Sequence, residues 1–416
     1  LKWDLLRTIR EAHSSPSRTS RAMRSTLIVA EITLGFVLVI GAGLMIRTMA
    51  NIHRVNPGFE PRRLLTFEVE MPGRNYAKPG AMENFAREWA STLRALPGVE
   101  AAGGVSHLPL DDYPNWYSPY RPADVPEKEA GAFIADHRCV TPDYFRAMGT
   151  RLLEGRYFTD DDRNGGREVV IVDEMLARAT WPGQSAIGKR VESEHFTPRG
   201  IVPVMSEVVG VVEHVRNHSL SQQLRGEIYM PFEQSARSHL SWAVRTSGDP
   251  LALTGAVRGA LHRRDPLLAA SKMRPMTAYV EKASAPAEFT AVLAGVFAAL
   301  ALLLAAIGIY GVISYSVSQR MHEMGVRMAL GASGSDVLRL VMREGLWLTA
   351  AGVAIGAAGA VELSRFLTTM IYGVSPLDPA AYAAAFTVIP AAALLGCWRP
   401  ARRAASANPA DTIRAD

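Results

Sequence analysis

The amino-acid sequence predicts an α-helical membrane protein with four transmembrane helices and a large α+β extracytoplasmic domain between helices 1 and 2. The mean hydropathy of the 416 residues is +0.06, which is higher than usual for a wholly soluble protein and lower than usual for a compact transporter. Long apolar runs occur once near the start and three times in the last third of the chain. Membrane spans combined with a large water-facing part account for both observations.

The composition also excludes several classes of protein. An apolar share of 48% excludes an intrinsically disordered chain, and two cysteines in 416 residues exclude a disulfide scaffold. Cys139 and Cys397 are expected in different compartments, so we do not expect them to pair. The net charge of +5 is spread too thinly along the chain to indicate binding of nucleic acid.

The first predicted span covers residues 27–46, and its only charged residue is Glu31. About 20 residues are needed for a helix to cross the hydrocarbon core of a bilayer. A signal peptide is the alternative, but its apolar region has about 7–15 residues and ends in a small-residue cleavage site. This run is longer and ends in Leu-Met-Ile-Arg, so a retained membrane anchor is the better interpretation.

The other three predicted spans cover residues 289–317, 346–363 and 381–398. The last of them contains Pro390, which kinks a membrane helix without forbidding it. Gly352 and Gly356 lie four residues apart in the third span, a spacing that favours close helix–helix packing in lipid.

The distribution of Lys and Arg predicts the orientation of these spans. Positive residues lie in the lead (residues 1–26), in the connection 318–345 and in the tail (residues 399–416), whereas the short loop 364–380 has only Arg365. Because short cytoplasmic flanks carry the excess of Lys and Arg, both termini are expected in the cytoplasm. Residues 47–288 are then expected to lie outside it.

The predicted extracytoplasmic domain shows two strand–helix–strand patterns. The first consists of strands 64–71 and 99–105 around a helix over 81–96, and the second starts with strand 240–245 and helix 250–262. The segment between them predicts an inserted lobe over about 111–201, from which strands at 207–212 and 227–232 lead back.

Two runs look like ligand-binding motifs and are interpreted as turns. The run from Gly183 to Arg190 matches the phosphate-binding pattern G-x-x-x-x-G-K, but Arg190 stands where Mg²⁺ requires a Ser or Thr hydroxyl. The acidic run 160–162 is similar to a calcium loop but lacks the Glu at the twelfth position, so a polar turn is predicted.

His214 and His218 have the spacing of two metal ligands on one helical face. The preceding residues 208–212 look like a strand, and further ligands are not visible at a convincing spacing. We therefore interpret both as solvated loop histidines. A convincing catalytic residue set is not visible either, so the chain is not predicted to be an enzyme, and neither a metal nor a cofactor is predicted in it.

Glu31 is an intramembrane carboxylate, and such groups are candidates for function or for ion pairing. It lies about one turn inside the predicted span. Pairing with an arginine of the lead is favoured over a role in transport.

The connection 318–345 contains a glycine-bearing hinge over residues 330–333. Ser333 or Ser335 is predicted to cap a following short amphipathic helix, with Asp336 in its first turn. That helix would present Val337, Leu340 and Val341 on one face. Its two possible sites, the membrane surface and a groove on a cytosolic partner, stay open on these grounds.

At this point the chain resembles a known family, the MacB/FtsX-type ABC transporter permeases. The connection and the tail carry the strongest likeness, in 310–320 (YGVISYSVSQR), 323–332 (EMGVRMALGA), 399–405 (RPARRAA) and Asn408-Pro409. Shorter matches lie at 29–31, 41–44, 56–59, 96–100, 155–156, 181–183 and 209–212, so the resemblance covers nearly the whole chain.

The resemblance implies a porter-type extracytoplasmic domain with an inserted second lobe, at the bacterial inner membrane. It also implies an ABC ATPase subunit as partner, with ATP bound there and not in this chain. A second permease copy or a fused half, membrane lipids, a periplasmic adaptor and an outer-membrane channel are the other implied partners. The residues implied for contact with the ATPase and for the hinge are Glu323, Gly325, Arg327, Leu330, Gly331 and Ala332.

The implied function is to transmit ATPase-driven motion to the periplasmic domain and so to drive export or extraction of a substrate. The alternative is a scaffold or signal-transmitting membrane protein whose periplasmic domain binds and regulates a partner. The lead resembles the middle of longer permeases with two such units in tandem, so we expect the second half of one of these.

Overall fold

The computed structural model describes residues 18–73, 75–112, 115–126, 133–197, 200–222, 225–366, 368 and 371–406. These residues form two compact units. A helical unit comprises the residues up to His53 and from Pro286 onward, and an α+β unit extends from Arg54 to Ala285. The start of the predicted lead, before residue 18, and the Asn408-Pro409 ending lie outside the described residues.

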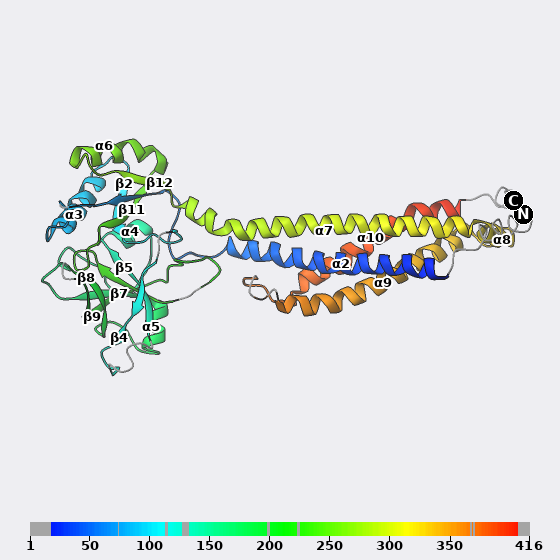
Figure 1. The fold of residues 1–416 in the computed structure, drawn as a ribbon, viewed down its shortest axis with the longest axis horizontal. Helices are drawn as coiled ribbons and strands as arrows, with labels where there is room; N and C mark the ends of the chain where they lie inside the picture. The colour runs from blue at the N-terminus through cyan, green and yellow to red at the C-terminus, as the bar shows by residue number, and fades with distance from the viewer. Residues whose placement is uncertain are drawn as a thin grey trace, which may run out of the picture. The chain divides into compact units, whose positions relative to one another are not determined.

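Four helices in the described part of the chain are long and apolar enough to cross a membrane. They are α2 (Arg18–Ile52), α7 (Thr277–Gln319), α9 (Gly334–Phe366) and α10 (Pro379–Ala405) (Figure 1). Each contains one of the four predicted spans and continues beyond it at both ends. Hydropathy detects only the apolar middle of such a helix, because residues that extend beyond the hydrocarbon core are free to be polar.

Glycines allow these helices to pack closely. A Cβ atom on Gly352 of α9 would lie 2.6 Å from Ile32 Cγ2 of α2, and one on Gly356 would lie 2.8 Å from Phe36 Cβ. A Cβ on Gly396 of α10 would lie 2.7 Å from the carbonyl oxygen of Ala306 in α7. The packing role predicted for Gly352 and Gly356 is therefore confirmed.

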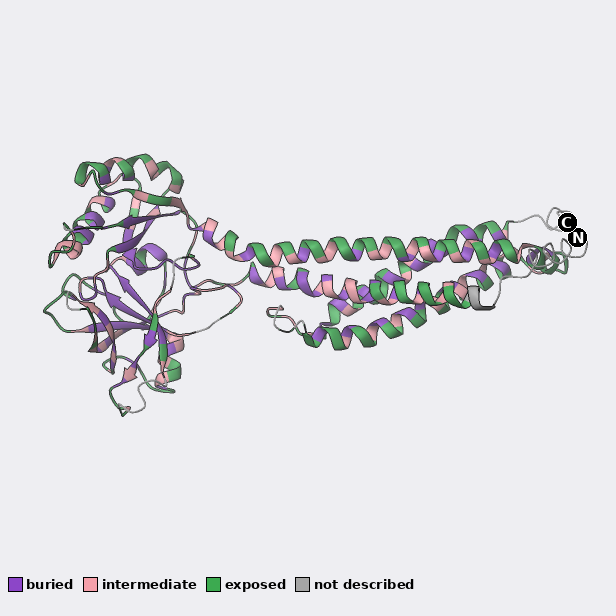
Figure 2. Cartoon of the chain, viewed as in Figure 1, coloured by how far each residue is buried: buried purple, intermediate pink, exposed green. Residues whose placement is uncertain are grey.

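Helix α7 leaves much of its apolar surface exposed within this chain, as Figure 2 shows along its length. In a membrane, such a surface faces lipid or another protein. The exposed apolar side chains include Phe289, Val292, Val296, Phe297, Leu300, Leu303, Leu304 and Ile307.

The described residues of the α+β unit form one mixed sheet of 12 strands. Across it, the main path runs through β12 (Ala270–Pro275), β1 (Leu64–Glu70), β11 (His239–Thr246), β2 (Val99–Val105), β5 (Ile134–Val140), β10 (Glu227–Pro231), β7 (Val169–Asp173), β9 (Gly200–Val212), β8 (Arg190–Thr197) and β4 (Arg121–Pro122). Off this path, β3 (Tyr117–Pro119) pairs with β5, and β6 (Leu152–Gly155) pairs with β9.

The first half of the sheet, from β12 to β2, is antiparallel and comes from the two predicted strand–helix–strand segments. Their helices are α3 (Ala81–Arg94) and α6 (Thr254–Arg264), the latter preceded by a short 3-10 turn, η2 (Pro250–Leu253). The helical spacing in α3 buries Phe85, Trp89 and Leu93, as its sequence predicts. The Trp89 ring meets Phe67 of β1 edge to face, with ring centroids 6.5 Å apart.

The second half of the sheet is formed by strands that lie between β2 and β11 in the amino-acid sequence. It includes parallel pairs of β5 with β10 and of β7 with β9. The predicted end of the inserted lobe at residue 201 falls inside β9, and β9 and β10 both pair with strands of that lobe. The pairing thus extends the lobe to Pro231. Parallel pairs join strands that are distant in sequence, so apolar patterns alone do not reveal them.

Among the described residues, a single register pair, Val105 with Val140, joins the two halves of the sheet. Beside it, Gly104 N donates to Thr141 Oγ1 at 2.8 Å. Helix α4 (Tyr144–Met148) packs so closely against β2 at this point that a Cβ on Gly103 would overlap the backbone of Tyr144.

Candidate functional site

A short helix, α8 (Met321–Ala329), lies between α7 and α9 and carries three of the predicted contact residues. Arg327 Nη2 donates to Glu323 Oε1 at 2.5 Å, one turn apart on a face that is about half exposed. Met324 and Gly325 are buried on the other side of the helix. Helix α8 is therefore amphipathic, with a charged side available to a partner.

The predicted hinge follows α8 directly. Gly331 has a φ of +101°, a backbone conformation that side chains with a Cβ atom disfavour. Ala332 N donates to the carbonyl oxygen of Arg327 at 3.0 Å and so closes the end of α8. Leu330 is 83% exposed. All six residues implied by the resemblance thus lie together in one helix and its following turn.

The prediction of a separate short helix after the hinge is wrong. Instead, α9 begins at Gly334 and continues without interruption to Phe366, so Val337 and Val341 belong to the first turns of a long helix. Asp336 lies in the first turn as predicted, but its carboxylate and not a serine hydroxyl is the acceptor: Ser333 N donates to Asp336 Oδ2 at 3.0 Å, and Ser333 Oγ donates to the same oxygen at 2.6 Å. The first turns of a spanning helix outside the hydrocarbon have the same amphipathic pattern as a short helix, which explains the error.

Contacts at both sides of the hinge hold α8 in place. Arg320 Nη1 lies 3.4 Å from Glu344 Oε2, which joins the residue before α8 to the third turn of α9. A Cβ on Gly334 would lie 2.8 Å from the carbonyl oxygen of Ala405 at the end of α10. The start of α9 therefore contacts the ends of two other helices.

Glu31 lies in α2, apart from this cluster. A Cβ on Gly308 of α7 would overlap the Glu31 carboxylate, so this carboxylate rests directly on the glycine. Arg24 lies over the Tyr315 ring, 4.1 Å from its centroid, and not on Glu31. Arginines before residue 18 are outside the described residues, so the predicted pairing of Glu31 stays a prediction.

The two turn predictions in the α+β unit are confirmed. The run from Gly183 to Arg190 follows α5 (Glu174–Thr180), has positive φ angles at Gly183 and Gly188, and leads into β8. In the acidic run, Asp162 receives two hydrogen bonds from Arg156, at 2.6 and 2.8 Å.

The prediction that His214 and His218 are solvated is wrong. His214 Nδ1 contacts Asp173, and His218 Nε2 lies 2.5 Å from Asp136, with both aspartate side chains almost fully buried. The two histidines follow the end of β9 in a loop and do not share a helical face. A group of three side chains able to hold a metal ion is not found in the described ranges.

These histidines belong to a buried polar network that the sequence analysis missed. Arg138 pairs with Glu227, and Asn217 donates to the same carboxylate. Burial raises the pKa of Asp136, but the His218 hydrogen bond and the nearby arginines outweigh it and hold that pKa below its usual value. The sequence signal that could have revealed this network is the presence of charged residues within β5 and β10, because a carboxylate in a buried strand requires a partner.

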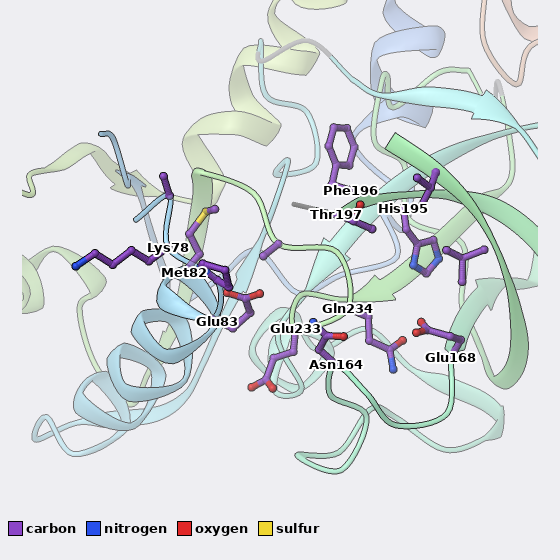
Figure 3. Close-up of a pocket in the computed structure, with 16 residues that line it drawn as sticks. Lys78, Met82, Glu83, Asn164, Glu168, His195, Phe196, Thr197, Glu233 and Gln234 are labelled. Atoms are coloured by element: carbon purple, nitrogen blue, oxygen red, sulfur yellow. The ribbon is translucent and has the colours of Figure 1, made fainter. Parts of the chain in front are cut away.

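The α+β unit also contains a cleft of about 550 Å³, shown in Figure 3. It lies between the start of α3 and the β8–β9 hairpin, so its two walls come from different halves of the sheet. The sequence did not predict it, since its lining comes from four separate segments. The lining residues with labels in Figure 3 are Lys78, Met82, Glu83, Asn164, Glu168, His195, Phe196, Thr197, Glu233 and Gln234.

Two protein-family models match the chain, one in its first part and one in its last part. The MacB-like periplasmic core domain matches residues 25–260, more than half of the chain, and the FtsX-like permease C-terminal domain matches residues 295–409.

Among curated relatives, the macrolide export ATP-binding/permease protein MacB of an Azoarcus species is 26% identical over 94% of this chain and 57% of its own length. MacB of Chromobacterium violaceum is 28% identical over 65% of this chain and 42% of its own length. The pyoverdine export ATP-binding/permease protein PvdT of Pseudomonas putida is 26% identical over 64% and 40%. The chain thus spans about half the length of these relatives.

Among solved structures, the periplasmic region of MacB from Actinobacillus actinomycetemcomitans is similar to 57% of this chain and 97% of its own, at 16% identity and a TM-score of 0.34. The two domain matches and the curated relatives agree with the resemblance drawn from the connection and the tail. The chain therefore belongs to the MacB/FtsX-type family of ABC transporter permeases.

Proposed function

We propose that this chain is the permease subunit of an ABC exporter and that it transmits motion from a separate ATPase subunit to its α+β unit. The observation that carries the proposal is α8 with its hinge. This element has a buried side at Met324, a charged side at Glu323 and Arg327, and an exposed Leu330. Such a helix suits a groove on a partner that receives both a charged and an apolar group.

In this proposal the helical unit spans the bacterial inner membrane four times, with both termini in the cytoplasm and the α+β unit in the periplasm. The excess of Lys and Arg in the lead, in the connection 318–345 and in the tail supports this orientation. Helix α8 then lies on the cytoplasmic side, where an ATPase subunit has access to it.

The proposed mechanism is mechanical. When ATP draws the partner ATPases together, α8 moves with them, and its short hinge passes the motion to α9. The close contacts of Gly352 and Gly356 with α2 make these two helices move as a pair. The chain passes from the end of α2 at Ile52 into the α+β unit, which begins at Arg54. ATP binding and hydrolysis are assigned to the partner, so the chain itself acts as a permease and not as an enzyme.

A second permease copy or a fused half is the other proposed partner inside the membrane. The exposed apolar surface of α7 supports this, because it is available for lipid or for another helix. A periplasmic adaptor and an outer-membrane channel are proposed for the periplasmic side. The names of the relatives describe export of a macrolide and of pyoverdine, and we propose export for this chain as well.

The test is charge reversal in α8 combined with a block of the hinge. We expect the double variant Arg327→Glu with Gly331→Pro to insert normally into the membrane but to lose stimulation of the cognate ATPase. The measurement is the rate of ATP hydrolysis by the co-purified ATPase in lipid nanodiscs, with the permease present or absent.

Arg365→Glu is the control for the charge reversal, because Arg365 is an exposed arginine at the other end of α9. It pairs with Glu362, three residues before it, as Arg327 pairs with Glu323, four residues before it. This variant is expected to keep full stimulation. If the double variant stimulates ATP hydrolysis as well as the unchanged chain does, α8 is not the coupling element. That result would favour the scaffold or signal-transmitting alternative.

A further inference from the structure

The cleft of Figure 3 carries an excess of negative charge. Three glutamates line it, namely Glu83, Glu168 and Glu233, and Arg87 neutralises Glu233 at 2.8 Å. Lys78 is the one basic lysine or arginine side chain among its described lining residues, and in Figure 3 this side chain points away from the cleft. Glu83 and Glu168 thus face the cleft without an ion pair to any described residue.

Glu168 is the more unusual of the two carboxylates. Its Oε2 atom is fully buried and accepts no hydrogen bond from the described residues. The neighbouring Arg167 does not compensate for this, because its guanidinium pairs with Glu207 at 3.2 Å. Burial raises the pKa of Glu168. This oxygen is itself closed off from the cleft. A partly buried carboxylate without a counter-charge is nevertheless costly, and a positive charge held in the cleft beside Glu168 lowers this cost.

The wall beside Glu168 is fixed and neutral. Burial lowers the pKa of His195 to about 4, so this ring carries no charge at neutral pH and does not compete with a cation. The Gln234 amide is already engaged, since its Oε1 accepts from Val169 N at 3.3 Å and its Nε2 donates to the Arg167 carbonyl oxygen at 2.8 Å. Figure 3 shows His195, Gln234 and Glu168 gathered at one end of the cleft.

The remaining lining combines apolar side chains with the neutral polar residues Asn164 and Thr197. Its larger apolar side chains are Met82, Phe196, Val202 and Val204. A volume of about 550 Å³ lies within the range of small-molecule sites, which combine an apolar lining with a few placed polar groups. We propose that this cleft binds an organic cation, an ammonium or guanidinium group on an apolar body, with Glu168 and Glu83 as its counter-charges.

The experiment uses the full chain in lipid nanodiscs, without an ATPase, and benzyltrimethylammonium as the probe. Its permanent charge does not titrate, and its ring suits the apolar lining. Binding is measured by saturation-transfer NMR against empty nanodiscs, with neutral benzyl alcohol and anionic phenylacetate as comparison compounds. We expect saturable binding of the cation and at least about tenfold weaker binding of the other two.

The variants Glu168→Gln and Glu83→Gln are each expected to weaken binding of the cation, by about tenfold for Glu168→Gln. Glu194→Gln is the matched control: Glu194 neighbours His195 in β8 but does not line the cleft, and this variant is expected to bind normally. If Glu168→Gln does not fold, Glu83→Gln in the first turn of α3 decides the question.

The proposal is overturned if benzyl alcohol binds as tightly as the cation or if both glutamine variants bind the cation unchanged. It is also overturned if Glu194→Gln weakens binding of the cation as much as Glu168→Gln does. Because the ATPase is absent from the measurement, a negative result leaves the proposed coupling through α8 untouched. A loss of ATPase stimulation in the α8 variant likewise leaves this cleft untouched.

Discussion

The guanidinium of Arg138 lies 3.3 Å from the carboxylate of Glu227, and both side chains are only 1% exposed. The same guanidinium donates to the His107 carbonyl oxygen at 3.0 Å and to Asn115 Oδ1 at 2.8 Å. Both charges are thus compensated inside the α+β unit. This pair connects the parallel strands β5 and β10 and, through Asn217, holds the loop that follows β9.

Arg138→Met is expected to leave the Glu227 carboxylate buried without its counter-charge. Removal of one member of a buried ion pair lowers the free energy of unfolding by about 3–5 kcal/mol. Chemical denaturation of the chain, followed by tryptophan fluorescence of the α+β unit, measures this. The double variant Arg138→Met with Glu227→Gln is expected to recover most of the loss, and equal losses in the single and the double variant would contradict the assignment.

The stability of the α+β unit is expected to depend on pH through His214. Burial alone would lower the pKa of His214, but its hydrogen bond to Asp173 raises the pKa above its ordinary value. A group whose pKa is raised by folding stabilises fully below its unfolded pKa of about 6.5, and this contribution disappears as the pH rises through the folded pKa. The thermal midpoint of the α+β unit is therefore expected to fall as the pH rises above about 6.5.

His214→Gln is expected to make the midpoint less dependent on pH in this range. His195→Gln serves as the comparison, because a histidine with a pKa of about 4 stays neutral throughout and contributes nothing to this slope. An unchanged slope in His214→Gln would assign the pH dependence to another group.

Gly331→Ala is expected to destabilise the turn between α8 and α9. A φ of +101° places a Cβ atom in unfavourable contact with the backbone, at a cost of about 1–2 kcal/mol. Gly311→Ala in α7 is the control, since its Cβ would meet nothing within 4 Å and alanine favours a helix. Thermal denaturation in nanodiscs is expected to rank Gly331→Ala below the unchanged chain and Gly311→Ala at or above it.

Gly356→Val is expected to separate α9 from α2. Its Cβ atom would lie 2.8 Å from Phe36 Cβ, and neither atom is at the end of a flexible side chain. Gly359→Val, one turn later, meets only Val37 Cγ2 at 3.9 Å and is expected to fold normally. The thermal midpoint of the purified chain distinguishes the two, and similar midpoints would argue against close packing at Gly356.

The sequence predicted those features that depend on local pattern. Four apolar runs indicated the four long helices, and the spacing of Phe85, Trp89 and Leu93 indicated the buried face of α3. The end of the inserted lobe was not predictable in this way, because it depends on which distant strands pair in parallel. The same limit applies to His214, because its partner Asp173 lies far away in the sequence, at the end of β7.

The same distinction between local and distant residues applies to the candidate sites. The motif from Glu323 to Ala332 identified α8 and its hinge, since these residues are contiguous and one glycine determines the turn. The cleft was invisible in the sequence because Glu83 and Glu168 lie far apart in the chain and only the folded sheet brings them to opposite walls.

The seam at Val105 and Val140 has an evolutionary consequence. All strands from Tyr117 to Pro231 are attached to the rest of the sheet through this one register pair. Recombination between related genes that exchanges this whole segment would therefore break few backbone pairings. The exchanged segment would still have to fit the apolar core that both halves of the sheet share, so side-chain packing rather than strand register would decide which exchanges succeed.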